Sequence, residues 1–143
     1  MRIAVVLLCV FVLTGCGGRN TPRVVIETDA GEVTVAVEVA DSPAERAVGL
    51  MHRPSLDADA GMIFVFAGER RGGFWMKDTL IPLSVGFANR DGQILSILDM
   101  EPCPADPCRV YDPGMTYATA LEVNRGAFAR WGVRAGDRLR LER

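Results

Sequence analysis

The segment GGFWMKDTLIP contains Lys77, the one lysine of the chain, whereas every other cationic side chain apart from His52 is an arginine. A lysine ammonium is a compact, titratable point charge, while an arginine guanidinium is a planar fork that stays protonated. Because alternate side chains of an extended strand share a face, we expect Trp75, Lys77 and Thr79 to project together. Trp75 would offer a stacking surface, and Lys77 a charge for a carboxylate, a phosphate or a sugar hydroxyl. Alternatively, Lys77 lays its stem along Trp75 and exposes its ammonium to water.

Two further charged residues could complete this site. Glu122 lies in ALEVN, where Leu121 and Val123 are the apolar neighbours, and a covered carboxylate on a strand needs a partner. Lys77 or Arg53 could be that partner, although Glu122 could equally be an exposed strand carboxylate. Arg53 could hold an anionic ligand through two hydrogen bonds, or it could cap the carbonyl groups of a preceding helix. The candidate ligand-binding residues are therefore Trp75, Lys77, Thr79, Arg53 and Glu122.

The first residues, MRIAVVLLCVFVLTGCGG, have the pattern of an exported lipoprotein. The apolar run over 3–13 is too short to span a bilayer, which needs roughly 20 residues, but it is typical of a secretory signal. Small residues then precede Cys16, as in a bacterial lipobox, in which the cysteine becomes the mature N-terminus and carries the lipid. We predict a signal peptide over 1–15, lipidation at Cys16 and a polar tether over 16–23. The alternative is an ordinary signal peptide with an incidental cysteine.

This pattern also predicts where the protein resides. A lipid anchor at the N-terminus would bind the exported protein stably to a membrane of the cell envelope. Gly17, rather than an aspartate, follows the cysteine, so nothing marks the protein for retention at an inner membrane. The expected location is the outer membrane, facing the periplasm.

Two cysteines, Cys103 and Cys108, lie in EPCPADPCR. Export predicts an oxidising compartment, and two prolines in the four-residue spacer favour a tight, stiff loop. We predict a structural disulfide rather than a redox pair, which usually has two spacer residues, or a zinc site, which needs further Cys or His ligands. Methionine and His52 are ligand types for copper(I), but the methionines lack close spacing. The sequence therefore predicts no metal and no cofactor.

The charge pattern and the missing motifs limit the function classes. The formal net charge is −2, and arginines and acidic residues are interspersed without a basic stripe, so nucleic acid is not an expected partner. No serine lies in a Gly-x-Ser-x-Gly elbow, and no glycine-rich phosphate loop is present. We therefore assign no catalytic residue.

The rest of the chain, over 24–143, predicts one mainly β domain. VVIETDAGEVTVAVEVA is typical of a hairpin, and Ser42 with Glu45 forms a capping box that predicts a short helix over 43–51. MIFVF, GFWMKDT, LSVGFANRDGQILSILDM, TYATALEVN and DRLRLE predict strands, and GAFARWG predicts a second short helix. About eight strands with one or two short helices indicate a compact β sandwich or barrel.

Five segments resemble a known family. GLMHRPSL, GMIFVF, FWMKDTLIPLSVGF, MEPC and LEVNRGAFARWGVRAGDRL are similar, in order and spacing, to the small secreted family called domain of unknown function 192, over nearly all of 32–140. The resemblance implies a jelly-roll-like β sandwich. It implies no activity, because the family is named for lacking one. The family often has Asn where this chain has Asp78, which places a carboxylate beside Lys77.

We thus expect a lipid-anchored, exported domain that binds a small polar or anionic ligand, or an envelope partner, around Trp75 and Lys77. One alternative is an enzyme acting on an envelope glycan or metabolite, with Lys77 and Glu122 as acid and base. Another is a purely structural accessory lipoprotein. The fold cannot choose among them, because β sandwiches host all three. A pocket lined by Trp75, Lys77 and Glu122 would favour ligand binding or catalysis.

Overall fold

The computed structural model describes residues 21–143, so the predicted signal peptide, Cys16 and most of the tether lie outside the described residues. Within 21–143 there are nine strands and two short helices. The strands are β1 (Arg23–Thr28), β2 (Gly31–Ala40), β3 (Ala60–Arg70), β4 (Phe74–Trp75), β5 (Leu83–Ala88), β6 (Ile94–Met100), β7 (Val110–Tyr111), β8 (Tyr117–Asn124) and β9 (Arg138–Glu142). The helices are α1 (Pro43–Val48) and α2 (Ala127–Arg130). No helix in this part of the chain is long and apolar enough to cross a membrane.

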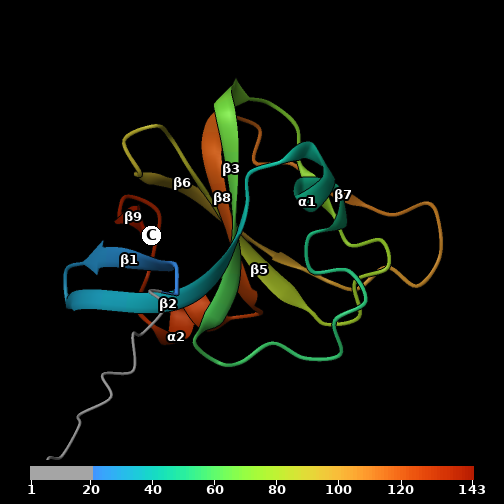
Figure 1. The fold of residues 1–143 in the computed structure, drawn as a ribbon, viewed down its shortest axis with the longest axis horizontal. Coiled ribbons are helices and arrows are strands. Elements are labelled where there is room, and N and C mark those ends of the chain that lie inside the picture. The colour runs from blue at the N-terminus through green and yellow to red at the C-terminus, as the bar shows by residue number, and fades with distance from the viewer. Residues whose placement is uncertain (1–20) are drawn as a thin grey trace, which may run out of the picture.

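Seven strands form one curled sheet in the order β6-β5-β8-β3-β2-β1-β9, and β4 pairs with β7 in a separate ribbon. Within this seven-stranded sheet of residues 21–143, β2 and β3 are paired in parallel and all other neighbours are antiparallel. The sheet curls until β9 approaches the start of β6, where a bridge joins Gln93 to Arg138 and the Ile94 N–H donates to the Asp137 carbonyl at 2.8 Å (Figure 1). This mainly β, barrel-like architecture confirms the predicted fold class.

The two faces of the sheet carry two apolar clusters. Side chains alternate along each strand, so on β3 Ile63 enters one cluster while Met62 and Phe64 enter the other. The inner core lies inside the curl and includes residues from β1, β2, β3, β8 and β9. The outer core lies on the opposite face of β3, β8 and β5, where Leu50 and Met76 from two loops cover it. The candidate site residues lie at or beside the outer core.

Helix α1 begins as the sequence predicts and ends earlier. The Glu45 N–H donates to the Ser42 Oγ at 3.2 Å and the Ser42 N–H donates to the Glu45 carboxylate at 2.9 Å, which confirms the capping box. The predicted end at residue 51 is wrong because Gly49 takes a positive φ of 51° with ψ of −132°, a backbone conformation that favours glycine and terminates the helix. The chain then turns into the long loop that leads to β3.

The predicted strand in GFWMKDT is mostly irregular. Pairing with β7, a strand absent from the sequence-based expectations, is limited to the Phe74 and Trp75 positions. Asp78 then has φ of 53°, a left-handed conformation that aspartate tolerates better than most residues. A disulfide joins Cys103 to Cys108, and a bridge pairs Cys103 with Lys77. The disulfide loop is thereby held beside Lys77.

Candidate functional site

Trp75 and Lys77 lie together, as the alternation of an extended segment predicts. The Lys77 Nζ is 5.7 Å from the centroid of the Trp75 ring, and Trp75 is 50% exposed. The ammonium also donates a hydrogen bond of 2.8 Å to the carboxylate of Asp106, which comes from the disulfide loop. This hydrogen bond raises the pKa of Lys77 above its ordinary value. Lys77 is therefore a charged, partnered group at the surface and is poorly suited to act as a neutral base.

Thr79 does not share the exposed face of Trp75 and Lys77. It is 7% exposed, and its hydroxyl donates to the Lys77 carbonyl at 3.3 Å. The left-handed turn at Asp78 breaks the alternation on which the prediction depended. Thr79 thus fixes the local turn rather than facing the space beside Trp75.

Arg53 forms a fork with Glu38 on β2. Two of its nitrogen atoms donate to the two carboxylate oxygens, each at 2.7 Å. These hydrogen bonds lower the pKa of Glu38 below its ordinary value. Arg53 therefore caps no helix carbonyl through its guanidinium, and a ligand anion would have to compete with Glu38 for it.

Glu122 is buried in the middle of the sheet, with 4% of the residue exposed. It faces the outer core, directly opposite Met62 on β3 and Val85 on β5. Burial raises its pKa to about 8, and no charged or hydrogen-bonding group of the described residues contributes to that shift. Glu122 is thus a carboxylic acid that stays largely protonated at neutral pH.

The structure does not assemble the acid and base pair of the enzyme hypothesis. Lys77 is bound to Asp106 and Arg53 is bound to Glu38, so both partners that the sequence suggested for Glu122 are engaged elsewhere. Neither candidate partner, Lys77 or Arg53, therefore compensates Glu122, and the alternative of an exposed strand carboxylate is wrong as well because Glu122 is only 4% exposed. The physical reason is that the loops carrying the two cations reach toward the surface, where hydrated carboxylates are available.

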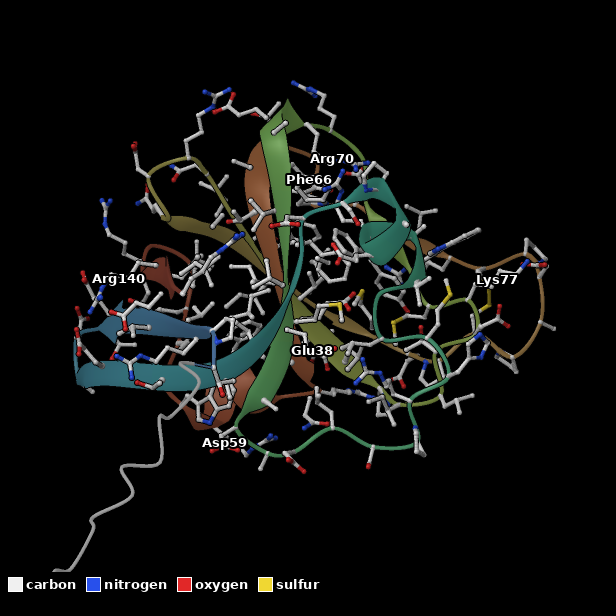
Figure 2. The ribbon with its side chains drawn as sticks, in the orientation of Figure 1. Glu38, Asp59, Phe66, Arg70, Lys77 and Arg140 are labelled. Carbon is white, nitrogen blue, oxygen red and sulfur yellow. A yellow bond between two sulfur atoms is a disulfide. The ribbon has the colours of Figure 1, made fainter. Side chains whose placement is uncertain are left out.

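A pocket that no sequence motif predicts lies beside Trp75. Its volume is about 110 Å³, and we call it the aromatic–arginine pocket because it is lined by Arg46, Phe64, Phe66, Arg70, Gly73, Phe74 and Trp75. Both arginines lie over the ring of Phe66, with their Cζ atoms 5.2 Å and 4.7 Å from its centroid. Figure 2 shows Phe66 and Arg70 beside α1, with Lys77 farther toward the edge of the molecule.

The two arginines of this pocket have no acidic partner in the described part of the chain. No carboxylate of residues 21–143 forms an ion pair with Arg46 or Arg70. Arg46 donates to the carbonyls of Asp41 and Val65, and Arg70 donates weakly to the carbonyl of Arg71 at 3.4 Å. The carbonyl groups hold Arg46 in place but do not neutralise it. The pocket therefore presents two positive charges that an anion could meet.

The aromatic wall of the pocket continues into the outer core. Phe64 and Phe66 contact Phe74 and Tyr117 edge to face, with centroids 4.8 Å and 5.7 Å apart respectively. The Tyr117 hydroxyl is buried and has no hydrogen-bond partner among residues 21–143. Burial raises the pKa of Tyr117, and the positive charge of Arg70 opposes that rise. A rigid aromatic wall thus backs the two guanidinium groups.

Gly73 allows Trp75 to reach this position. A Cβ atom on Gly73 would lie 2.2 Å from the carbonyl oxygen of Tyr111, which is too close for any residue with a side chain. The absence of a side chain therefore lets the segment before β4 lie directly on β7. In this position the Phe74 ring contacts Phe64 of β3.

The pocket could not be found from local sequence signals. Arg46 belongs to α1, Arg70 to the end of β3 and Trp75 to β4, and no motif spacing links these elements. The segment FVFAGERR is the one local signal for the pocket, because its aromatic residues precede two adjacent arginines.

The described residues contain no group of three or more His, Cys, Asp or Glu side chains able to hold a metal ion. The arginines and aromatic rings of the pocket are instead suited to recognise an anion with a flat, apolar body.

Comparisons with known proteins give a family and similar folds. The model of the family called domain of unknown function 192, described as "Uncharacterized ACR", matches residues 24–141. No curated protein matches the sequence. A crystal structure from Sinorhizobium meliloti 1021, of a protein named as a candidate transcription regulator, is 36% identical with a TM-score of 0.77, and the match covers 83% of this chain and 92% of that one. A protein of unknown function from Novosphingobium aromaticivorans DSM 12444 is 30% identical with a TM-score of 0.76, and that match covers 82% and 83%.

Proposed function

Because this chain belongs to the family called domain of unknown function 192, whose description names no activity, its function must be inferred from the site, and we propose that it binds a small anionic ligand in the aromatic–arginine pocket. The ligand has a carboxylate or phosphate group and a flat, apolar part. This proposal keeps the ligand class expected from the sequence. It moves the centre of the site from Lys77 to the pocket that Trp75 lines and Lys77 does not.

The observation that supports this proposal is the pair of guanidinium groups without a carboxylate. Arg46 and Arg70 both lie over Phe66 at the pocket, and a bound anion would relieve the repulsion between their two like charges. A bound carboxylate would accept charge-assisted hydrogen bonds from both. Aromatic walls would contact the apolar part of the ligand.

Trp75 and Lys77 have supporting roles in this proposal. Trp75 lines the pocket and its ring is half exposed, so it can stack on a flat ligand. Lys77 lies on the same ring and adds a third positive charge to the neighbourhood, partly offset by Asp106. Its contribution is therefore to the long-range attraction of anions rather than to direct contact in the pocket.

The competing functions have weaker support. An enzyme using Lys77 and Glu122 is disfavoured, because these side chains have separate environments and only Glu122 is buried. Transcription regulation, the role in the name of the Sinorhizobium protein, is disfavoured by a net charge of −2 and by arginines dispersed among carboxylates. A purely structural lipoprotein would not need two unneutralised arginines beside an exposed tryptophan.

The test uses benzoate as the probe and the fluorescence of Trp75 as the signal. The chain has two tryptophans, so Trp131→Phe leaves Trp75 as the sole indole reporter. We expect benzoate to change this fluorescence and to raise the melting temperature, while its neutral isostere benzamide does neither. Hydrogen bonds to charged groups contribute about 1.5–3 kcal/mol. Arg46→Gln or Arg70→Gln should therefore weaken benzoate binding roughly tenfold or more.

The matched control is Arg71→Gln, which removes the same charge from the neighbouring residue without altering the pocket lining. It should leave benzoate binding almost unchanged. Equal responses to benzoate and benzamide, or equal losses in the Arg70 and Arg71 variants, would count against the site. Mass spectrometry of small molecules that co-purify with the native protein would then identify the natural ligand.

We also propose that the protein is exported and lipidated at Cys16, with its ligand met in the periplasm. The support is the order of charge, apolar run, small residues and cysteine in the first residues. Cys16→Ser should release the protein from the membrane fraction of the native host. Unchanged membrane fractionation of this variant would refute the lipid anchor.

A further inference from the structure

A second depression lies on another face of α1, away from Arg46. It has a volume of about 420 Å³, within the usual range for small-molecule sites. We call it the α1–β2 groove, and its principal lining residues are Glu38, Ala40, Ala44, Val48, Arg53 and Met62. It shares no lining residue with the aromatic–arginine pocket. Any ligand of the groove is therefore separate from the proposed function.

The body of the groove is apolar. Ala40 is fully buried and Met62 is 6% exposed, so these two residues form a dry floor. Helix α1 buries none of its residues, and Val48 at the rim is 56% exposed. An apolar side chain on a surface helix next to an apolar floor suits contact with the hydrocarbon part of a ligand.

The polar part of the groove consists of two opposite charges side by side. Arg53 and Glu38 form two hydrogen bonds of 2.7 Å, yet their side chains remain 41% and 53% exposed. The other acidic residue of the lining, Glu45, is engaged in the capping box of α1, where its carboxylate accepts from the Ser42 N–H. The Arg53–Glu38 pair is thus the group that a ligand would meet.

This pair discriminates among ligands by their charge. A simple anion would have to take Arg53 from Glu38 and leave that carboxylate without its partner, and a simple cation would do the reverse to Arg53. A zwitterion compensates both groups, because its ammonium can donate to Glu38 while its carboxylate accepts from Arg53 through a planar fork. Inserting it would exchange one ion pair for two.

We infer that the α1–β2 groove binds a small zwitterion with an apolar side chain, the chemistry of an apolar α-amino acid. The charged end lies between Glu38 and Arg53, and the side chain lies over Met62, Ala40 and Val48. The charge complementarity of the groove, rather than its size, selects this class of ligand.

The experiment compares leucine with two analogues that each lack one charge. Titration calorimetry of the full-length chain in detergent uses L-leucine, 4-methylpentanoate, which lacks the ammonium, and 3-methylbutylamine, which lacks the carboxylate. We expect leucine to bind at least tenfold more tightly than either analogue. Glu38→Gln and Arg53→Gln should each weaken leucine binding by a similar factor, because each removes one of the two charges. Binding of either analogue as tightly as leucine would overturn the inference.

Two controls separate binding from folding and from the other pocket. Ala44→Leu fills the groove from an exposed helix position without touching the ion pair, and it should abolish leucine binding while leaving the protein folded. Arg143→Gln breaks a comparably exposed pair with Asp41 and should leave leucine binding intact. Benzoate binding should persist in Glu38→Gln. Leucine binding that survives both Ala44→Leu and Glu38→Gln would refute the site, whatever the fate of benzoate.

Discussion

Glu38 and Glu122 occupy one row of the curled sheet, on either side of Met62. Both lie directly opposite Met62 in the register, Glu38 across the parallel β2–β3 pairing and Glu122 across the antiparallel β3–β8 pairing. The pKa values of their carboxyl groups nevertheless shift in opposite directions. The pKa of Glu38 is lowered by hydrogen bonds from Arg53, whereas burial raises the pKa of Glu122 to about 8.

The comparison shows that position on a sheet does not set the state of a carboxyl group. Glu38 keeps 53% of its side chain in water and gains a guanidinium, so its charged form is stabilised. Glu122 lies on the other side of β3, where it is only 4% exposed and gains no partner among the described residues, so its neutral form is favoured. The exposure of each carboxyl group and the presence of a cationic partner decide whether its charged or its neutral form is favoured. Both are set by the covering loops and the neighbouring strands.

The largest expected effect is a loss of pH dependence in Glu122→Gln. The folded pKa of about 8 lies above the unfolded value of 4.5, so the folded state holds the proton more tightly. The stability contributed by the protonated acid is fully present below pH 4.5 and is lost as the pH rises to 8. At about 1.4 kcal/mol per pKa unit, this loss reaches several kcal/mol. Urea unfolding between pH 5 and 8 should show a much flatter profile for the variant.

The matched control for this measurement is Glu38→Gln, which removes a carboxyl group from the same row. Its folded pKa is lowered, so the stability from the charged carboxylate is present above the unfolded pKa and is lost as the pH falls through the folded pKa. Between pH 5 and 8 its profile should therefore run parallel to that of the wild type. Parallel profiles for Glu122→Gln as well would show that the buried carboxyl group is not protonated.

A smaller effect is expected when Arg53→Gln removes the partner of Glu38. The pair is exposed, and such pairs contribute about 0.2–1 kcal/mol. The pKa of Glu38 should rise toward its ordinary value, measurable by NMR titration of the Glu38 carboxyl carbon. Glu122 should keep its raised pKa in the same titration. A shift of both carboxyl groups would mean that Arg53 acts on the buried one, against the environment that the structure gives it.

The smallest effect is expected for Lys77→Met. This variant tests whether the Lys77–Asp106 pair is solvated like exposed Glu38 or desolvated like buried Glu122. Its partner Asp106 has 61% of its side chain exposed, so water can solvate the carboxylate that remains. The melting temperature should stay nearly unchanged without ligand. A large fall, of the kind expected when a buried ion pair is broken, would place Lys77 in a structural role instead.

Several elements were predictable because their signals are local. The hairpin of β1 and β2, the existence of strand β8 and the capping box of α1 each depend on neighbours a few residues away, although β8 is buried on both faces instead of alternating. The family resemblance was confirmed over residues 24–141. The predictions that were wrong concern places where one backbone conformation changes the pattern. Gly49 ended the helix early and Asp78 turned Thr79 inward, and both have positive φ.

The sequence by itself determined which residue types are present, where most of the longer strands fall and where α1 begins, and that Trp75 and Lys77 lie side by side. It could not determine which charges meet, because contacts between distant segments depend on how the sheet curls and which loops cover it. Only the tertiary structure brought Arg46, Arg70 and Trp75 to one pocket. Only the tertiary structure paired Arg53 with Glu38 and buried Glu122, because desolvation depends on everything packed around a group rather than on its neighbours in the chain.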